Sequence, residues 1–137
     1  MINFRRLVEE YRSQPTRSTE HFGNPLKRLT NWEGKDDWRL VHTVEDAGRD
    51  MASKYHFLSK DIPKEDLQEL EQVKILCAEM SKISLKHRRD GDELKRSHLE
   101  DLPARALALV EEFKKKLPTL VEKALAKAMK EAGVDLS

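Results

Sequence analysis

The sequence predicts an all-α fold, a helical bundle of three main helices with a short helix at the N-terminus. Leu occurs 18 times and Ala 10 times, whereas Val, Ile and Thr together total 16, so the composition favours helix over strand. Apolar residues also recur at spacings of three and four, the repeat of one helix face, and show no sustained alternation typical of strands.

The composition indicates one domain with a sparing use of apolar residues. A chain of 137 residues is long enough for one domain and too short for two well-developed ones. Charged residues make up 37% and hydrophobic residues 38%, so the apolar side chains must gather on helix faces to form a core. The net charge of +1 excludes nucleic-acid or membrane binding driven by the overall charge alone.

The sequence predicts a cytoplasmic protein that does not contact a membrane. Arg5 and Arg6 interrupt any apolar signal segment at the start, and no later stretch of 18 apolar residues follows. The single cysteine, Cys77, has no partner for an internal disulfide or a zinc site, which suits a reducing compartment.

Residues 1–35 are predicted to be a short helix followed by a long polar and basic arm. Residues 3–12 form an amphipathic helix whose apolar face is Phe4, Leu7, Val8 and Tyr11. Residues 13–35 carry turn-forming residues and are expected to form a connection. Four apolar residues are candidates to anchor it: Phe22, Leu26, Leu29 and Trp32.

Residues 36–133 are predicted to be the bundle core, followed by a tail at 134–137. The first main helix spans 36–58, with a seam of Trp38, Val41, Val44, Gly48, Met51, Tyr55 and Leu58. The second follows Asp61-Ile62-Pro63 and reaches about Asp90, with a seam of Leu67, Leu70, Val73, Cys77, Met80 and Ser84.

The third main helix begins after the same type of signal, Asp101-Leu102-Pro103, and ends at Gly133. Its predicted seam is Ala106, Leu109, Phe113, Leu117, Leu120, Ala124 and Ala128. Pro118 lies inside this helix and removes one backbone hydrogen bond, so we expect a kink or a break near Leu117.

His42, Glu45 and Asp46 are the candidate metal ligands, because His42 and Asp46 are four residues apart on a helix. Further ligands would have to come from other helices, and neither Glu-x-x-His nor His-Glu-x-x-His occurs. A solvated charged face explains these residues better, so we predict no metal and no cofactor.

The sequence contains no recognisable catalytic residues. It lacks a glycine-rich phosphate loop and a nucleophile elbow. A small all-α metal-dependent phosphohydrolase is the second alternative, with Glu33 and Asp36 or Asp66 and Glu69 as its carboxylate pairs. The first pair is at the edge of a predicted loop, and the second is in the first turns of a predicted helix, where acidic residues commonly stabilise the helix start. The chain is therefore not expected to be an enzyme.

A basic cluster around Gly91 supports the first alternative, an accessory nucleic-acid-binding protein. Its candidate phosphate-binding residues are Lys86, Arg88, Arg89, Lys95 and Arg96. No aromatic residue is interleaved with them to stack on bases, and Asp90, Asp92 and Glu93 interrupt them.

The leading interpretation is a non-enzymatic, regulatory protein–protein interaction module. Residues 1–30 carry six basic and three acidic residues, whereas residues 31–70 carry six basic and ten acidic ones. This uneven distribution of charge suits a protein partner, or a homodimer in which the basic arm of one copy lies on the acidic surface of another. The candidate partner-binding residues are Phe4, Leu7, Tyr11, Arg12, Arg17, Trp32 and Trp38.

Overall fold

A computed structural model describes residues 22–131 and 133 of the chain. These residues form helices and turns, and no strand occurs among them, so the predicted all-α class is confirmed. The elements in chain order are α2 (Asn24–Thr30), α3 (Trp38–Ser59), a 3-10 helix (Lys64–Asp66), α4 (Gln68–Arg89), a second 3-10 helix (Arg96–Leu99) and α5 (Leu102–Glu131). None of these helices is long and apolar enough to cross a membrane.

The helix α2 corrects the expectation that residues 13–35 form one long connection. Gly23 precedes it with a left-handed backbone (φ 81°), and Pro25 stands in its first turn, where a missing N–H breaks no intrahelical bond. Three of the predicted anchors are at most 1% exposed: Phe22, Leu26 and Leu29. The described core therefore begins at Phe22 and not at residue 36.

The helix α3 agrees with its predicted range, but its buried face is displaced from the predicted seam. The buried residues are Leu40, Thr43, Val44, Ala47, Met51 and Leu58. Trp38 was predicted to belong to the seam and is instead 69% exposed. Leu40 takes the first core position, and Trp38 lies two residues earlier, about 200° away around the helix axis.

The helix α4 starts later than predicted. Lys64–Asp66 forms a 3-10 helix, and the α-helix begins at Gln68 and not directly after Pro63. Ile62 is 4% exposed and belongs to the core, so the chain completes its reversal before α4 begins. The predicted seam of α4 is confirmed, because all of its residues are buried: Leu67, Leu70, Val73, Cys77, Met80 and Ser84.

The helix α5 begins at Leu102, as its start signal predicts, and continues through Pro118. Pro118 therefore does not end the helix, and a kink there stays a prediction. Near the C-terminal end Ala128 is exposed, and its neighbour Met129 is buried in its place. The buried stripe of these turns advances in steps of four: Leu117, Val121, Leu125 and Met129.

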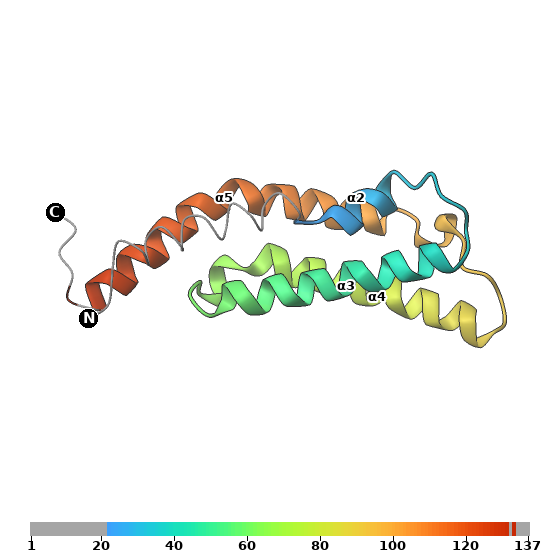
Figure 1. Cartoon of the computed structure of the whole chain (residues 1–137), viewed down its shortest axis with the longest axis horizontal. Coiled ribbons are helices and arrows are strands. Elements are labelled where there is room, and N and C mark those ends of the chain that lie inside the picture. Colours follow the sequence, from blue (N-terminus) through green and yellow to red (C-terminus); the bar gives the residue numbers. More distant parts are fainter. Residues whose placement is uncertain (1–21, 132, 134–137) are drawn as a thin grey trace.

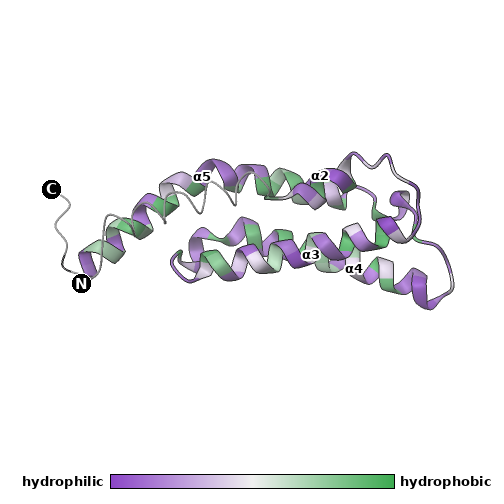
Figure 2. Cartoon of the chain, viewed as in Figure 1, coloured by the Kyte–Doolittle hydropathy of each residue, from purple (hydrophilic) through white to green (hydrophobic). Residues whose placement is uncertain are grey.

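The helices pack in a ring, in which α2 contacts α3 and α5, and α4 contacts the same two helices (Figure 1). Figure 2 shows hydrophilic and hydrophobic residues mixed along each helix, as expected for amphipathic helices that share one core. Within the core Phe22 stacks on Phe113, with ring centroids 6.2 Å apart. The three predicted main helices are thus joined by a short fourth element, α2.

Candidate functional site

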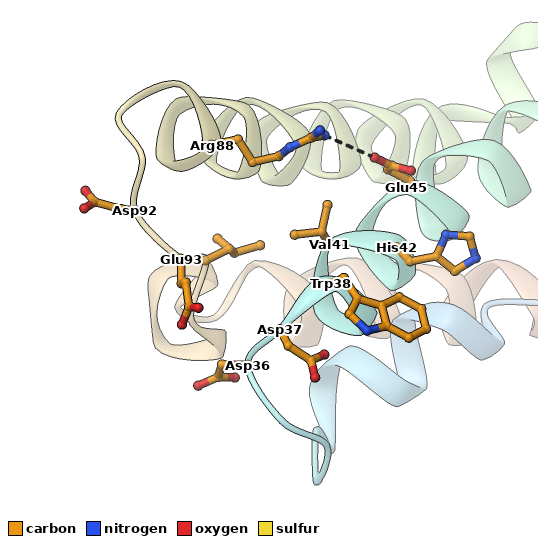
Figure 3. A pocket seen from close by; sticks show the side chains of 10 residues that line it. Asp36, Asp37, Trp38, Val41, His42, Glu45, Arg88, Asp92 and Glu93 are labelled. Carbon is orange, nitrogen blue, oxygen red and sulfur yellow. Dashed lines mark ion pairs between the residues drawn. The ribbon is translucent and has the colours of Figure 1, made fainter.

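A pocket of about 620 Å³ opens at the end of the bundle where α3 begins and α4 ends (Figure 3). The two residues before α3, its first turns, the end of α4 and the chain after α4 supply its lining. The lining residues are Asp36, Asp37, Trp38, Val41, His42, Glu45, Arg88, Asp92, Glu93 and Leu94. Leu94 is 3% exposed and Val41 is partly buried, so these two form its apolar part.

Negative charge dominates this pocket. Five carboxylates line it, against one guanidinium, that of Arg88, and one imidazole, that of His42. Asp92 and Glu93 are exposed and make no ion pair or side-chain hydrogen bond with the part of the chain that the structure describes. Carboxylates gathered around a concave surface focus a negative potential there, so the pocket attracts cations.

Hydrogen bonds hold the carboxylates at the start of α3. The Asp37 carboxylate caps α3 by accepting a hydrogen bond from the Arg39 N–H, with 2.9 Å between Oδ1 and N. The Asp36 carboxylate accepts one from the Arg96 N–H, with Oδ1 and N 3.2 Å apart. Figure 3 shows both carboxylates on the same side of the pocket as Glu93.

Trp38 is the one large aromatic side chain among the lining residues. Its side chain is largely in solvent, and the guanidinium carbon of Arg39 lies 5.6 Å from its ring centroid. The face of an indole ring attracts cations, and tryptophan is among the residues that contribute most to protein interfaces. Trp38 is therefore well placed to contact a ligand in the pocket.

The three candidate metal ligands lie close to charged neighbours. His42 Nε2 lies 3.6 Å from Asp46 Oδ2. Glu45 lies 3.8 Å from Arg88 Nη1, an interaction that joins α3 to α4 (Figure 3), and 3.5 Å from Arg49 Nη2. Within residues 22–131 and 133, no group of three or more His, Cys, Asp or Glu side chains is arranged to hold a metal ion.

The five candidate phosphate-binding residues have different environments. Arg88 pairs with Glu45, as described above. Arg96 donates from Nε to the main-chain oxygen of Leu29 and from Nη1 to that of Glu100, the latter at 3.0 Å. The remaining three are exposed: Lys86, Arg89 and Lys95. Two of the five therefore make contacts within the fold.

Of the predicted partner-binding residues, the structure describes the two tryptophans. The others lie outside the described residues: Phe4, Leu7, Tyr11, Arg12 and Arg17. Trp32 is half-buried against the core, and a Cβ added to Gly34 would lie 2.9 Å from its ring. Trp32 therefore contributes to the fold, and Trp38 is the exposed tryptophan of the pair.

Sequence reasoning assigned four carboxylates to no shared pocket, and it considered Asp36 only as a weak magnesium ligand paired with Glu33; the four are Asp36, Asp37, Asp92 and Glu93. The excess of acidic residues in 31–70 was a signal for the first two. The other two were interpreted as interruptions of a basic cluster, because nothing local shows that they face the start of α3.

Comparison with known proteins shows no matching family model, no matching curated protein and no matching solved structure. The functional interpretation therefore depends on the chemistry of the pocket itself.

Proposed function

We propose that this chain is a non-enzymatic helical interaction module, and that the pocket beside Trp38 binds a cationic segment of a protein partner. One observation carries the proposal: an indole that is 69% exposed stands at a pocket of about 620 Å³ whose charged lining is mainly carboxylate. An arginine or lysine side chain would meet both an aromatic face and negative charge there.

The indole and the carboxylates contribute to binding in different ways. A cation over an exposed indole contributes about 0.5–1 kcal/mol, and more when it is desolvated. The carboxylates contribute mainly to the rate of encounter and to the rejection of acidic partners. The Arg39 guanidinium carbon already lies 5.6 Å from the Trp38 ring centroid, so a cation of the partner would use the other face of the indole or displace Arg39.

Arginine is the expected contact residue of the partner. Its planar guanidinium stacks on an aromatic ring and donates to carboxylates in the same plane, whereas a lysine ammonium acts as a point charge. Glu93 and Asp92 are the expected acceptors, because they have no partner in the described part of the chain.

The proposal is tested by titrating the full-length chain with three unstructured peptides of equal length, one arginine-rich, one glutamate-rich and one neutral. We expect only the arginine-rich peptide to bind, with an affinity that falls as salt is added. Trp38→Ala should weaken this binding by about tenfold or more, as for an interface anchor. Glu93→Gln should weaken it less.

Phe57→Ala is the matched control, because Phe57 is also on α3 and is 40% exposed, but it lies near the other end of the helix, away from the pocket. It should leave binding unchanged. Equal binding by the Trp38→Ala and Phe57→Ala variants, or no preference for the arginine-rich peptide, would contradict the proposal.

A second copy of the chain is one partner that meets this description, because residues 1–30 carry an excess of basic residues, among them Arg12 and Arg17. We propose a homodimer on this ground, in a reducing, cytoplasmic environment. Light scattering at high micromolar concentration should give twice the mass of one chain, and Trp38→Ala should lower it. A monomer at that concentration would leave only a different protein as partner.

The alternative of nucleic-acid binding has less support. Arg88 and Arg96 make contacts within the fold, and the three remaining basic candidates lie close to Asp90, Asp92 and Glu93. A single-stranded oligonucleotide added to the same titration distinguishes the two functions.

A further inference from the structure

Two histidines join the end of α4 to the segment that follows it. The ring of His87, in the last turn of α4, stacks on the ring of His98, in the second 3-10 helix, with ring centroids 4.0 Å apart and ring planes inclined by 11°. Both side chains are partly buried. The two residues flank residues 91–95, so their contact closes this segment into a loop.

The backbone of this loop also depends on the two histidines. The chain leaves α4 through Gly91, whose left-handed backbone (φ 75°) accompanies a hydrogen bond from the Asp92 N–H to the His87 carbonyl, with N and O 2.8 Å apart. At the other end, the Lys95 N–H donates to Nδ1 of His98 at 3.0 Å, and the His98 N–H donates to the Lys95 carbonyl at 3.0 Å. Each histidine therefore holds one end of the loop.

The hydrogen bond from Lys95 requires His98 to be neutral. An imidazole nitrogen accepts a hydrogen bond only with a free lone pair, so Nδ1 carries no proton and the ring proton is on Nε2. A protonated imidazole has an N–H at both nitrogens. Its Nδ1 hydrogen would face the Lys95 N–H, and two donors would replace the donor and acceptor of the hydrogen bond.

The surroundings of His87 also favour a neutral ring. Its Nδ1 is buried and has no hydrogen-bond partner among the described residues. A proton added there would place an N–H donor and part of a positive charge at a buried position without an acceptor, which is unfavourable. With both rings protonated, two positive charges would also face each other across the stack.

Exposed charged groups surround the stack. The pocket of about 380 Å³ that both imidazoles line also contains Asp92, Glu93 and Lys95. The two carboxylates and the C-terminal end of α4 favour positive charge on the rings, whereas the Lys95 ammonium opposes it. The charged residues at the end of α4 itself are Lys86, Arg88, Arg89 and Asp90.

These groups do not outweigh the hydrogen bonding of the two Nδ1 atoms. Arg88 is close to Glu45 of α3, and Arg96 of the second 3-10 helix donates to two main-chain oxygens. Cations and carboxylates are both present, their contributions have opposite signs, and solvent screens those that are exposed. The two Nδ1 atoms therefore decide which protonation state the loop favours.

We propose that the stacked rings of His87 and His98 are a pH-sensitive contact, which holds residues 91–95 in place while both imidazoles are neutral and loosens this loop when they gain protons. Histidine side chains commonly change charge between about pH 8 and 5. The stabilisation is present above this range and is lost as the pH falls through it. Leu94 and Leu99 are 3% and 0% exposed in the core and do not titrate, so the change is local.

The loop links this contact to the pocket beside Trp38, because Asp92 and Glu93 line both pockets. These two carboxylates are the expected acceptors for a cationic partner. Binding of that partner should therefore weaken as the histidines gain protons. This consequence rests on the proposed function, whereas the loosening of the loop does not.

NMR of the full-length chain between about pH 8 and 5 tests the contact. We expect the ring signals of His87 and His98 and the amide signals of Asp92 and Lys95 to change over the same pH range. Protection of these two amides from hydrogen exchange, relative to an unstructured peptide at the same pH, should fall by about tenfold or more. Amides of the α4 seam should stay protected, which shows that the rest of the chain remains folded. Rings that gain protons while the two amides keep their protection would overturn the proposal, and this measurement needs no variant.

A variant without the two imidazoles should lose the pH dependence. His87→Phe keeps an aromatic ring in the stack, and His98→Asn keeps an acceptor near the position of Nδ1. In the double variant the two amides should be equally protected at both ends of the pH range. His56→Asn is the matched control, because His56 is exposed in the last turn of α3, and it should leave the pH effect unchanged. The same pH effect in the double variant as in the wild-type chain would show that other groups cause it.

Titration with the arginine-rich peptide separates this proposal from the proposed function. Binding to the wild-type chain should weaken by about threefold or more from about pH 7.5 to 5.5, and binding to the double variant should change little. If the peptide binds at neither pH while the two amides still respond, the proposed function is wrong and the pH-sensitive contact is supported. Equal binding at both pH values, with the loop loosened, would contradict the consequence for the pocket.

Discussion

The Nε of Arg96 donates a hydrogen bond to the main-chain oxygen of Leu29, which lies 67 residues earlier in the chain. Leu29 is in the last turn of α2, where its carbonyl has no partner within the helix. The same guanidinium donates from Nη1 to the Glu100 carbonyl. One side chain thus joins the end of α2 to the turn that precedes α5.

We expect Arg96→Ala to lower the free energy of unfolding by about 2 kcal/mol, because two carbonyls lose a charged donor. Arg96→Lys should recover little of this stability, since one ammonium group cannot donate to both carbonyls in the geometry of a guanidinium. Urea unfolding measures both effects. Arg89→Ala, at an exposed site, is the control and should change stability by no more than about 0.5 kcal/mol; an equal loss in both variants would contradict the role of Arg96.

The pair of Glu69 and Lys116 predicts a pH dependence of stability. The hydrogen bond from Lys116 lowers the pKa of Glu69 below its ordinary value of 4.5, and the bond to Glu69 raises the pKa of Lys116 above 10.5. The stabilisation from Glu69 is therefore present above pH 4.5 and is lost as the pH falls through the lowered pKa. The stabilisation from Lys116 is present below pH 10.5 and is lost as the pH rises through the raised pKa.

Glu69→Gln should accordingly reduce stability at pH 7, and the difference from the wild-type chain should shrink as the pH falls through the lowered pKa of Glu69. Urea unfolding at a series of pH values measures this. Glu65→Gln, an exposed carboxylate close by in the sequence, should show no such trend. A Glu69→Gln effect that is constant with pH would show that the ionised carboxylate is not its source.

Cys77 should be unreactive in the folded chain. Burial, with a smaller contribution from the charge of Asp50, raises the pKa of its thiol to about 12, and its side chain is 2% exposed. Only the thiolate attacks disulfide reagents, so its population near neutral pH is on the order of a thousandfold below that of an exposed thiol. Labelling with Ellman's reagent should be very slow in buffer and fast in guanidinium chloride; rapid labelling of the native chain would contradict the burial.

Pro118→Ala should stabilise α5. A proline inside a helix costs about 3 kcal/mol relative to alanine, and the ring of Pro118 is exposed, so its removal loses little packing. Thermal unfolding followed by circular dichroism measures the effect, with the exposed neighbour Thr119→Ala as control. A loss of stability on Pro118→Ala would show that the backbone direction it imposes is needed for packing.

The sequence by itself determined the elements whose signals are local. The seam of α4 and the start of α5 at Leu102 were predicted correctly, because helical spacing and proline in a first turn act within a few residues. The same reasoning placed the start of α4 too early. It could not show that Ile62 is needed in the core before the helix begins.

Only the tertiary structure decided what depends on distant partners. The seven residues of α2 are too few to be stable alone, and they form a helix because Leu26 and Leu29 are buried between α3 and α5. Trp38 is exposed because Leu40, about 200° away around the axis of α3, is the residue that faces the core. Asp36 and Glu93 share a pocket because the antiparallel packing of α3 and α4 brings the start of one helix to the end of the other. The spacing of residues along the chain does not predict that two distant side chains lie in one pocket. Contacts between helices supply the free energy that brings them together.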